Sequence, residues 1–206
     1  LDGSSAASDV YKRQISGSRL YDSTTTASSS ILTITSGVSG ESLSLTGSGV
    51  LGAASAGTQT ITNNNTLAIA DGSGGLASNY TLSGATINVT IIPRTLNVTL
   101  SREYDGTTAV SGASLTPTFD SLQGGETLAL SGTGSVSTAN VGSSKAVSLG
   151  SIALAAGSGN PSNYTLNSAT MNITQRVINL DGIRAYDATT NVLSSDINTF
   201  GNIVSG

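Results

Sequence analysis

Apolar and polar residues alternate along most of this chain with the period of a β-strand. In Thr95–Leu100, polar residues separate Leu96, Val98 and Leu100, so the apolar side chains lie on one strand face and the polar ones on the other. The same alternation occurs at Leu43 and Leu45, Leu67 and Ile69, Ile87, Val89 and Ile91, Leu128 and Leu130, Val147 and Leu149, and Met171 and Ile173. No stretch keeps a helical period, and β-branched residues are abundant. The pattern predicts an all-β chain of antiparallel strands with one face toward water.

A Tyr-Asp pair occurs three times, and each time two threonines follow after one further residue. The three copies begin at Tyr21, Tyr104 and Tyr186, so the intervals between them are nearly equal. A second motif, Asn-Tyr-Thr-Leu, begins at Asn79 and recurs at Asn163, after almost the same interval. Two motifs that return at one period indicate a unit that was copied and then diverged.

The repeats divide the chain into 15–94, 95–176 and the opening of a third unit at 177–206. We set residues 1–14 aside as an artefact, because Ser4–Gln14 (SSAASDVYKRQ) resembles the translated end of a transposase-type sequencing adapter. A period of roughly 80 residues is too long for one coil of a solenoid and suits a small domain. The joints near Pro93 and Arg176 contain no glycine, and such stiff joints predict an extended rod.

Glycine-rich turns fall between the alternating segments, at a spacing of about 8 to 12 residues that is typical of a sandwich or barrel. The predicted fold is therefore a tandem series of small antiparallel β-sandwich modules of Ig-like type. A β-grasp-like module is the alternative.

Composition excludes several function classes. The formal net charge is −4, and the few basic residues are scattered, so we expect no nucleic-acid partner. No run of about 18 apolar residues occurs, so we expect no membrane insertion in this segment. The chain has no Cys and no His, and Lys145 is the one lysine outside the adapter, so the usual nucleophile and base pairs are missing. We expect neither an enzyme nor a cofactor.

A carboxylate pair such as Asp105 and Glu126 could in principle serve a glycosidase. Their equivalents Asp22 and Glu41 are present in the first repeat. Recurrence favours a structural role over a single active site.

The motifs of the second repeat resemble the YDG repeat and the related MBG modules. The resemblance rests on Tyr104-Asp105-Gly106, Gly125-Glu126, Asn140-Val141-Gly142 with Lys145, and the Asn-Tyr-Thr-Leu motif. The other repeats depart from it, with Ser23 and Ala188 in place of Gly106. Such modules occur in tandem in filamentous-haemagglutinin-like exoproteins exported by two-partner secretion. The resemblance implies an extracellular all-β repeat of a bacterial adhesin and brings no catalytic residues.

The recurrent Asp22, Asp105 and Asp187 could be ligands for Ca²⁺, which prefers carboxylate oxygens. A calcium loop needs several donors at close spacing, and only Asp105 has another carboxylate, Glu103, nearby. A turn-forming aspartate after a strand is the favoured interpretation.

The recurrent tyrosines could stack on sugars or pack in the core. A residue copied in every repeat more often holds the repeat together, so we expect core packing with a hydrogen-bonded hydroxyl group. The residues in question are Tyr21, Tyr80, Tyr104, Tyr164 and Tyr186.

Glycosylation sequons occur in the chain, and we expect Asn88, Asn97 and Asn172 to be the outward-facing candidates. The other sequons begin at Asn64, Asn79 and Asn163.

The leading functional hypothesis is a stalk or spacer region of a large secreted adhesin at the bacterial cell surface, with adjacent repeats of the same chain as partners. The alternative is that the modules themselves bind glycans or proteins on host or bacterial surfaces.

Overall fold

The computed structural model describes residues 14–35, 38 and 40–204. The segment set aside above therefore lies outside the described residues, apart from Gln14. The chain divides into two compact units. Unit 1 consists of residues 1–94 together with two short segments, Gln123–Gly125 and Ser162–Thr165. Unit 2 contains the remaining residues.

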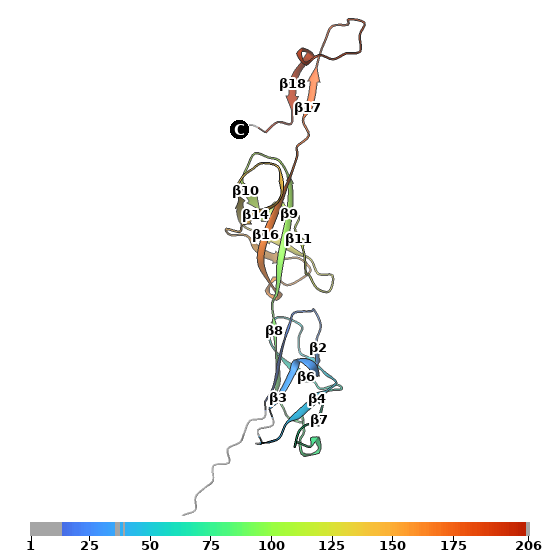
Figure 1. Cartoon of the computed structure of the whole chain (residues 1–206), viewed down its shortest axis with the longest axis vertical. Helices are drawn as coiled ribbons and strands as arrows, with labels where there is room; N and C mark the ends of the chain where they lie inside the picture. Colours follow the sequence, from blue (N-terminus) through green and yellow to red (C-terminus); the bar gives the residue numbers. More distant parts are fainter. Residues whose placement is uncertain (1–13, 36–37, 39, 205–206) are drawn as a thin grey trace, which may run out of the picture. The chain divides into compact units, whose positions relative to one another are not determined.

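Unit 1 is built on a curled six-stranded sheet in the order β2-β5-β6-β8-β1-β3 (Figure 1). Its strands are β1 (Gln14–Leu20), β2 (Thr26–Ser28), β3 (Leu32–Thr35), β5 (Ser48–Leu51), β6 (Gly57–Asn63) and β8 (Ile87–Ile92). A separate antiparallel pair is formed by β4 (Leu43–Thr46) and β7 (Ala68–Asp71).

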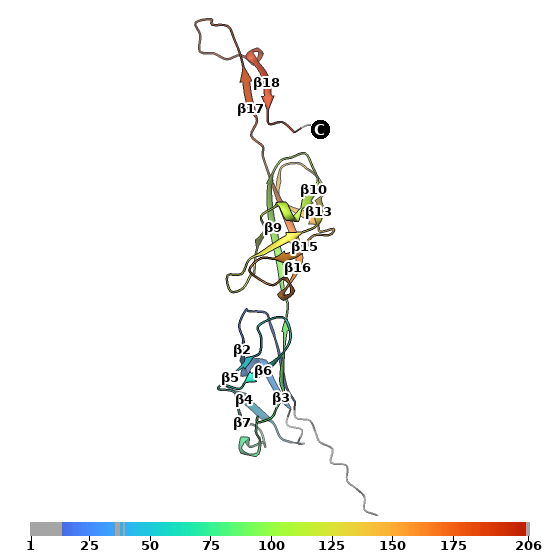
Figure 2. The same ribbon diagram turned by 180° about the vertical axis from the view of Figure 1, so that it is seen from behind.

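Unit 2 repeats this arrangement, with a sheet in the order β10-β13-β14-β16-β9-β11 and a separate pair of strands (Figure 2). The sheet contains β9 (Arg94–Glu103), β10 (Ala109–Ser111), β11 (Thr118–Phe119), β13 (Thr133–Val136), β14 (Gly142–Ser148) and β16 (Tyr164–Thr174). The separate pair is β12 (Leu128–Ser131) with β15 (Ala153–Ala156). Strand for strand, the order matches that of unit 1.

Short 3-10 turns complete the described secondary structure, and none of the described residues forms an α-helix. The turns are η1 (Ser29–Ile31), η2 (Ala77–Asn79), η3 (Gly112–Ser114), η4 (Pro161–Asn163) and η5 (Ser194–Asp196). The all-β prediction is confirmed, in the form of curled, half-barrel sheets.

The predicted alternation is also confirmed. In β9, Leu96, Val98 and Leu100 are buried while the polar residues between them are exposed. The core of unit 2 is formed by Val98, Leu100, Val110, Leu130, Val136, Val147, Ile152, Ala169, Met171 and Ile173. In unit 1, β8 is the counterpart of β16. Its residues Ile87, Val89 and Ile91 are buried in the same way as Ala169, Met171 and Ile173 of β16. Burial of these side chains is the main term that stabilises each unit.

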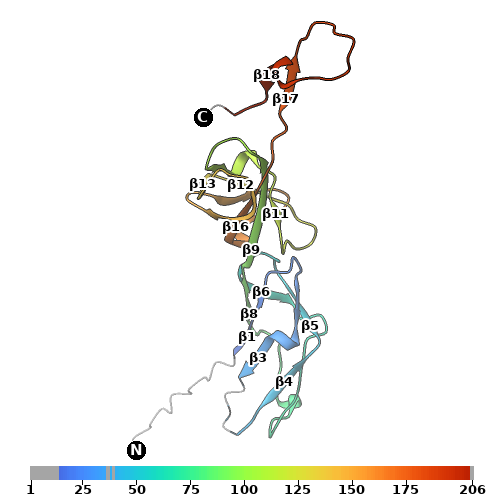
Figure 3. The same cartoon turned by 45° about the horizontal axis from the view of Figure 1, so that its top comes forward.

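One feature of the sheets differs from the prediction of antiparallel strands. β1, the first strand of the repeat, pairs with β8, the last, and the two run parallel (Figure 3). Parallel neighbours need a long crossover connection, and here the rest of the repeat supplies it. Because the prediction rested on alternation within single strands, it could not detect a pairing between the two ends of a repeat.

The opening of the third repeat forms a hairpin of β17 (Asn179–Gly182) and β18 (Ile197–Gly201). Ile178, directly before β17, and Leu180 within it are exposed, whereas their equivalents in the second repeat, Leu96 and Val98, are buried. The described residues after position 176 therefore do not build a core of their own.

Candidate functional site

The Tyr-Asp motif folds into the same turn in all three copies. The Asp22 carboxylate oxygen Oδ1 accepts hydrogen bonds from the Thr24 amide and the Thr24 hydroxyl group, both at 2.9 Å. Asp105 accepts the same two bonds from Thr107 at 3.0 Å, and Asp187 accepts them from Thr189 at 2.9 Å. A carboxylate that bonds the backbone two residues later is an Asx turn.

An arginine three residues before each aspartate completes the turn. Arg19 forms an ion pair with Asp22, Arg102 with Asp105 at 3.2 Å, and Arg184 with Asp187 at 2.7 Å. The same guanidinium groups donate hydrogen bonds to backbone carbonyl groups of the turn. Sequence reasoning missed these arginines because they lie singly along the chain. Their signal was the fixed Arg-x-Tyr-Asp spacing in every repeat.

The residue after each aspartate has a left-handed backbone, with φ of 63° at Ser23, 76° at Gly106 and 62° at Ala188. Glycine adopts this conformation without strain, whereas side chains disfavour it. Because Ser23 and Ala188 have nearly the same φ as Gly106, the turn keeps its shape in the two repeats that lack the glycine, although a side chain disfavours this conformation.

The environment of these aspartates lowers their pKa. Partial burial alone would raise the pKa of Asp22, but the hydrogen bonds from Arg19 and Thr24 outweigh it and hold the pKa below its ordinary value. For Asp105, too, burial opposes the shift in pKa, and the two Thr107 bonds and the Arg102 charge prevail. The pKa of Asp187 is lowered chiefly by the amide of Thr189.

These shifts predict acid sensitivity. A carboxyl group whose pKa is lower in the folded than in the unfolded chain stabilises the fold above the unfolded pKa of about 3.9, and the contribution disappears as the pH falls through the folded pKa. We therefore expect the free energy of unfolding to be flat from neutral pH to about pH 5 and to fall below about pH 4. The free energy of unfolding is measured from urea unfolding at pH 7, 5, 4 and 3, with circular dichroism as the signal.

The Asp105→Asn variant is the control, because an amide oxygen still accepts hydrogen bonds but does not titrate in this range. The variant should be less stable than the original chain at pH 7 and should lose less stability on acidification. Equal losses in the two chains would show that the titrating groups lie elsewhere.

In unit 1, the Tyr21 ring is covered by the segment Ser162–Thr165. Tyr21 and Tyr164 are 3% and 5% exposed, and their rings meet edge to face with centroids 5.3 Å apart. The Tyr164 hydroxyl oxygen accepts a hydrogen bond from the Gln123 amide at 3.0 Å. Beside it, the Asn163 side-chain oxygen accepts one from the Ala56 amide at 2.8 Å.

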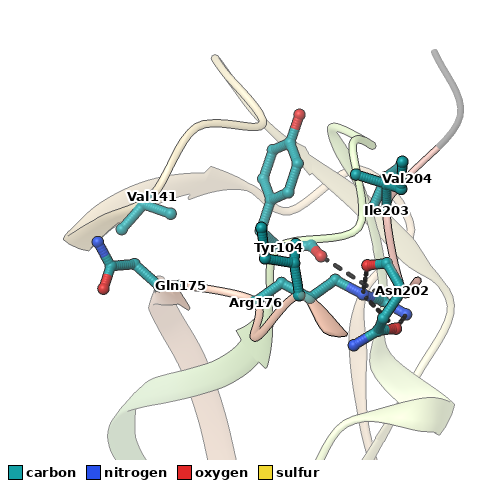
Figure 4. Close-up of a pocket in the computed structure, with 8 residues that line it drawn as sticks. Tyr104, Val141, Gln175, Arg176, Asn202, Ile203 and Val204 are labelled. Atoms are coloured by element: carbon teal, nitrogen blue, oxygen red, sulfur yellow. Dashed lines mark hydrogen bonds between the residues drawn. The ribbon is translucent and has the colours of Figure 1, made fainter. Parts of the chain in front are cut away.

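In unit 2, Tyr104 lines an open cavity of about 350 Å³. Val141 and Gln175 lie on one side of its ring in Figure 4, and Ile203 and Val204 on the other. Arg176 forms the floor, since it donates to the Tyr104 carbonyl oxygen at 3.4 Å and to the Asn202 side-chain oxygen at 2.9 Å.

The remaining signature residues lie in other surroundings. Tyr186 is 94% exposed. The Tyr80 hydroxyl group hydrogen bonds the Glu41 carboxylate, while Asn79 is exposed. The same sequence motif thus occupies a buried position at Asn163 and an exposed one at Asn79.

The three candidate glycosylation residues all make hydrogen bonds. Asn88 and Asn172 use the side-chain oxygen, which accepts from Thr60 at 3.0 Å and from the Ser144 amide at 2.8 Å. The Asn97 side-chain nitrogen, the atom that would carry a glycan, donates to Asp120 at 2.8 Å. Glycosylation replaces one of the two hydrogens on that nitrogen, so a modified Asn97 could keep its bond to Asp120 only with the remaining N–H.

The described residues hold no candidate metal centre and no candidate membrane helix. No group of three or more acidic, His or Cys residues is arranged among them to hold a metal ion. No helix in this part of the chain is long and apolar enough to cross a membrane.

The YDG domain family model matches this chain twice, at residues 10–89 and 90–171. The first match begins inside the segment 1–14 set aside above. No curated protein and no solved structure is similar enough to the chain to be matched. Because the two family matches cover well over half of the sequence, the chain belongs to the YDG domain family and carries two YDG domains in tandem.

Proposed function

We propose that the chain is a stalk or spacer segment of a large secreted bacterial adhesin, exported by two-partner secretion and placed outside the cell. In this proposal its modules are Ig-like sandwiches in an extended rod, its partners are adjacent repeats, and it is not an enzyme. A spacer must carry tension from one end to the other without unfolding. The observation that supports this role is the pairing of the first and last strands of the repeat.

β1 and β8 pair in parallel from Ile15 opposite Ile87 to Leu20 opposite Ile92. The Tyr21 amide extends the contact with a bond to the Ile92 carbonyl oxygen at 2.9 Å. Because the strands are parallel, the start of β1 and the end of β8 lie at opposite ends of the pair. Tension between them slides one strand past the other, so the hydrogen bonds resist together and not one after another.

Unit 2 has the same arrangement. β9 and β16 are neighbours in its sheet, and the Tyr104 amide bonds the Thr174 carbonyl oxygen at 2.9 Å. Two units with one force-resisting strand pair each fit a repeated mechanical element better than a single binding site.

Single-molecule pulling tests the proposal in the full chain. The sequence has no cysteine, so handles can be attached at introduced ones. Handles at Gln14→Cys and Thr95→Cys load the β1–β8 pair in shear. Handles at Gln14→Cys and Ala85→Cys lie beside the same end of the pair and unzip it. We expect a clearly higher unfolding force in the first geometry, and equal forces would overturn the proposal.

Binding of the full chain to a glycan array and to cells supplies a second readout, with a heat-unfolded sample as control. The spacer proposal expects no saturable binding by the folded chain. Saturable binding by the folded form alone would overturn the spacer proposal and indicate that the modules themselves are adhesive.

A further inference from the structure

The cavity beside Tyr104 has a counterpart in unit 1 that is occupied. There, the Asn163-Tyr164 pair covers Tyr21, which corresponds to Tyr104. Asn163 is 4% exposed and is the one buried polar residue among those that the structure describes. A buried amide side chain requires a hydrogen-bond partner, and the Ala56 amide provides it. The contact between the two segments is therefore specific, because it includes a buried hydrogen bond as well as the packing of apolar groups.

The cavity beside Tyr104 in unit 2 is flanked by a loop equivalent to the one that contains Ala56 in unit 1. Val141 comes directly before β14, as Ala56 comes directly before the equivalent strand β6. Both loops are held by a side chain from the following strand: Gln59 donates to the Ser55 carbonyl oxygen at 3.0 Å, and Lys145 to that of Asn140 at 2.8 Å.

The arginine at the end of each repeat also recurs. Arg94 donates to the Tyr21 carbonyl oxygen at 2.9 Å, as Arg176 does to that of Tyr104. The difference between the two sites is the covering pair. Tyr21 is buried, whereas Tyr104 is half-buried beside its cavity and Val141 is 49% exposed.

We propose that the cavity lined by Tyr104, Val141, Gln175 and Ile203 is the docking site for the Asn-Tyr loop of the YDG module that follows in the chain. The tyrosine ring of that loop packs edge to face on Tyr104. The asparagine oxygen accepts a hydrogen bond from the Val141 amide. Successive YDG modules thus interlock through one recurring pair, and this inference concerns the YDG modules alone and does not rest on the stalk proposal.

The chain offers a direct test. Residues 177–206 correspond to 95–124, so adding a copy of residues 125–176 after Gly206 completes the third repeat with its own Asn163-Tyr164 pair. Amide hydrogen exchange then compares the extended chain with the original chain. We expect exchange of the Val141 amide to slow by about fivefold or more, as it gains a hydrogen bond, and the Ala56 amide to stay unchanged.

The matched control is the extended chain in which only the asparagine that copies Asn163 is replaced by alanine. In this variant, the exchange rate of the Val141 amide should return to that of the original chain. A folded third module with unchanged Val141 exchange would overturn the proposal. A second outcome would also overturn the proposal. If the original chain associates in a concentration-dependent way and the Asn79→Ala variant does not, the Asn-Tyr loop of a second copy fills the cavity.

A peptide experiment decides the case in which the added module does not fold. The peptide PSNYTL, residues 161–166, is titrated into the original chain to millimolar concentration, and the Val141 amide and Tyr104 ring signals are followed by NMR. Shifts that a PSAYTL peptide does not cause support the proposal. Absence of shifts, or equal shifts with both peptides, overturns it.

Discussion

Replacing Gly47 by alanine is expected to remove a large part of the free energy of unfolding of unit 1. Gly47 joins β4 to β5 with φ of +74°, a conformation that costs an alanine about 1–2 kcal/mol. In addition, a β-carbon there would lie far inside van der Waals contact with the Thr66 carbonyl oxygen. The obstacle is backbone, so relief requires the turn before β7 to move. We expect a loss above about 3 kcal/mol, out of the roughly 4–12 kcal/mol available to a unit of this size.

The control for this prediction is Gly84→Ala in the same unit. Gly84 has the same φ of +74°, but nothing lies within 4 Å of the position of its β-carbon. The control therefore carries the conformational cost without the clash. Hydrogen exchange of the β1 and β8 amides measures the stability of unit 1 in both variants. If the two variants lose the same stability, the close approach of Thr66 is not a constraint on the fold.

Much of the fold could be predicted because the relevant signal is local. The alternation at Leu96, Val98 and Leu100 is a property of one strand, and one face of that strand is buried as predicted. The repeated Tyr-Asp and Asn-Tyr motifs predicted tandem units, and the family matches agree. The parallel pairing of β1 with β8 is different, because it joins the two ends of a repeat, and no local period encodes it.

The candidate site was less predictable, for two separate reasons. The Arg-x-Tyr-Asp spacing is visible in the sequence, but the arginines form no cluster along the chain, and only their recurrence between repeats indicates a shared role. The burial of Asn163 was not visible at all. Asn79 lies in the same Asn-Tyr-Thr-Leu motif and is exposed, so the difference comes from what each loop contacts and not from the residues themselves.

Replacing Tyr21 by alanine is expected to destabilise unit 1 by about 3–5 kcal/mol, the usual cost of removing a buried aromatic ring. Tyr21 is 3% exposed, and its ring packs edge to face against Tyr164. Its removal leaves a cavity and also deprives Tyr164 of an aromatic contact worth about 0.5–1.5 kcal/mol beyond area burial. Urea unfolding, with hydrogen exchange to assign the loss to unit 1, measures the effect.

Tyr186→Ala is the matched control, since Tyr186 occupies the same place in the third copy of the motif and is 94% exposed. Surface substitutions away from special features usually change stability by less than about 0.5 kcal/mol, so this variant should unfold like the original chain. A second variant, Tyr21→Phe, keeps the ring and should lose far less than Tyr21→Ala. A large effect at Tyr21 and none at Tyr186 would mean that the signature tyrosine stabilises the fold only where another loop covers it. Equal, small effects at both positions would remove the packing role and leave surface recognition as the reason for a tyrosine in every repeat.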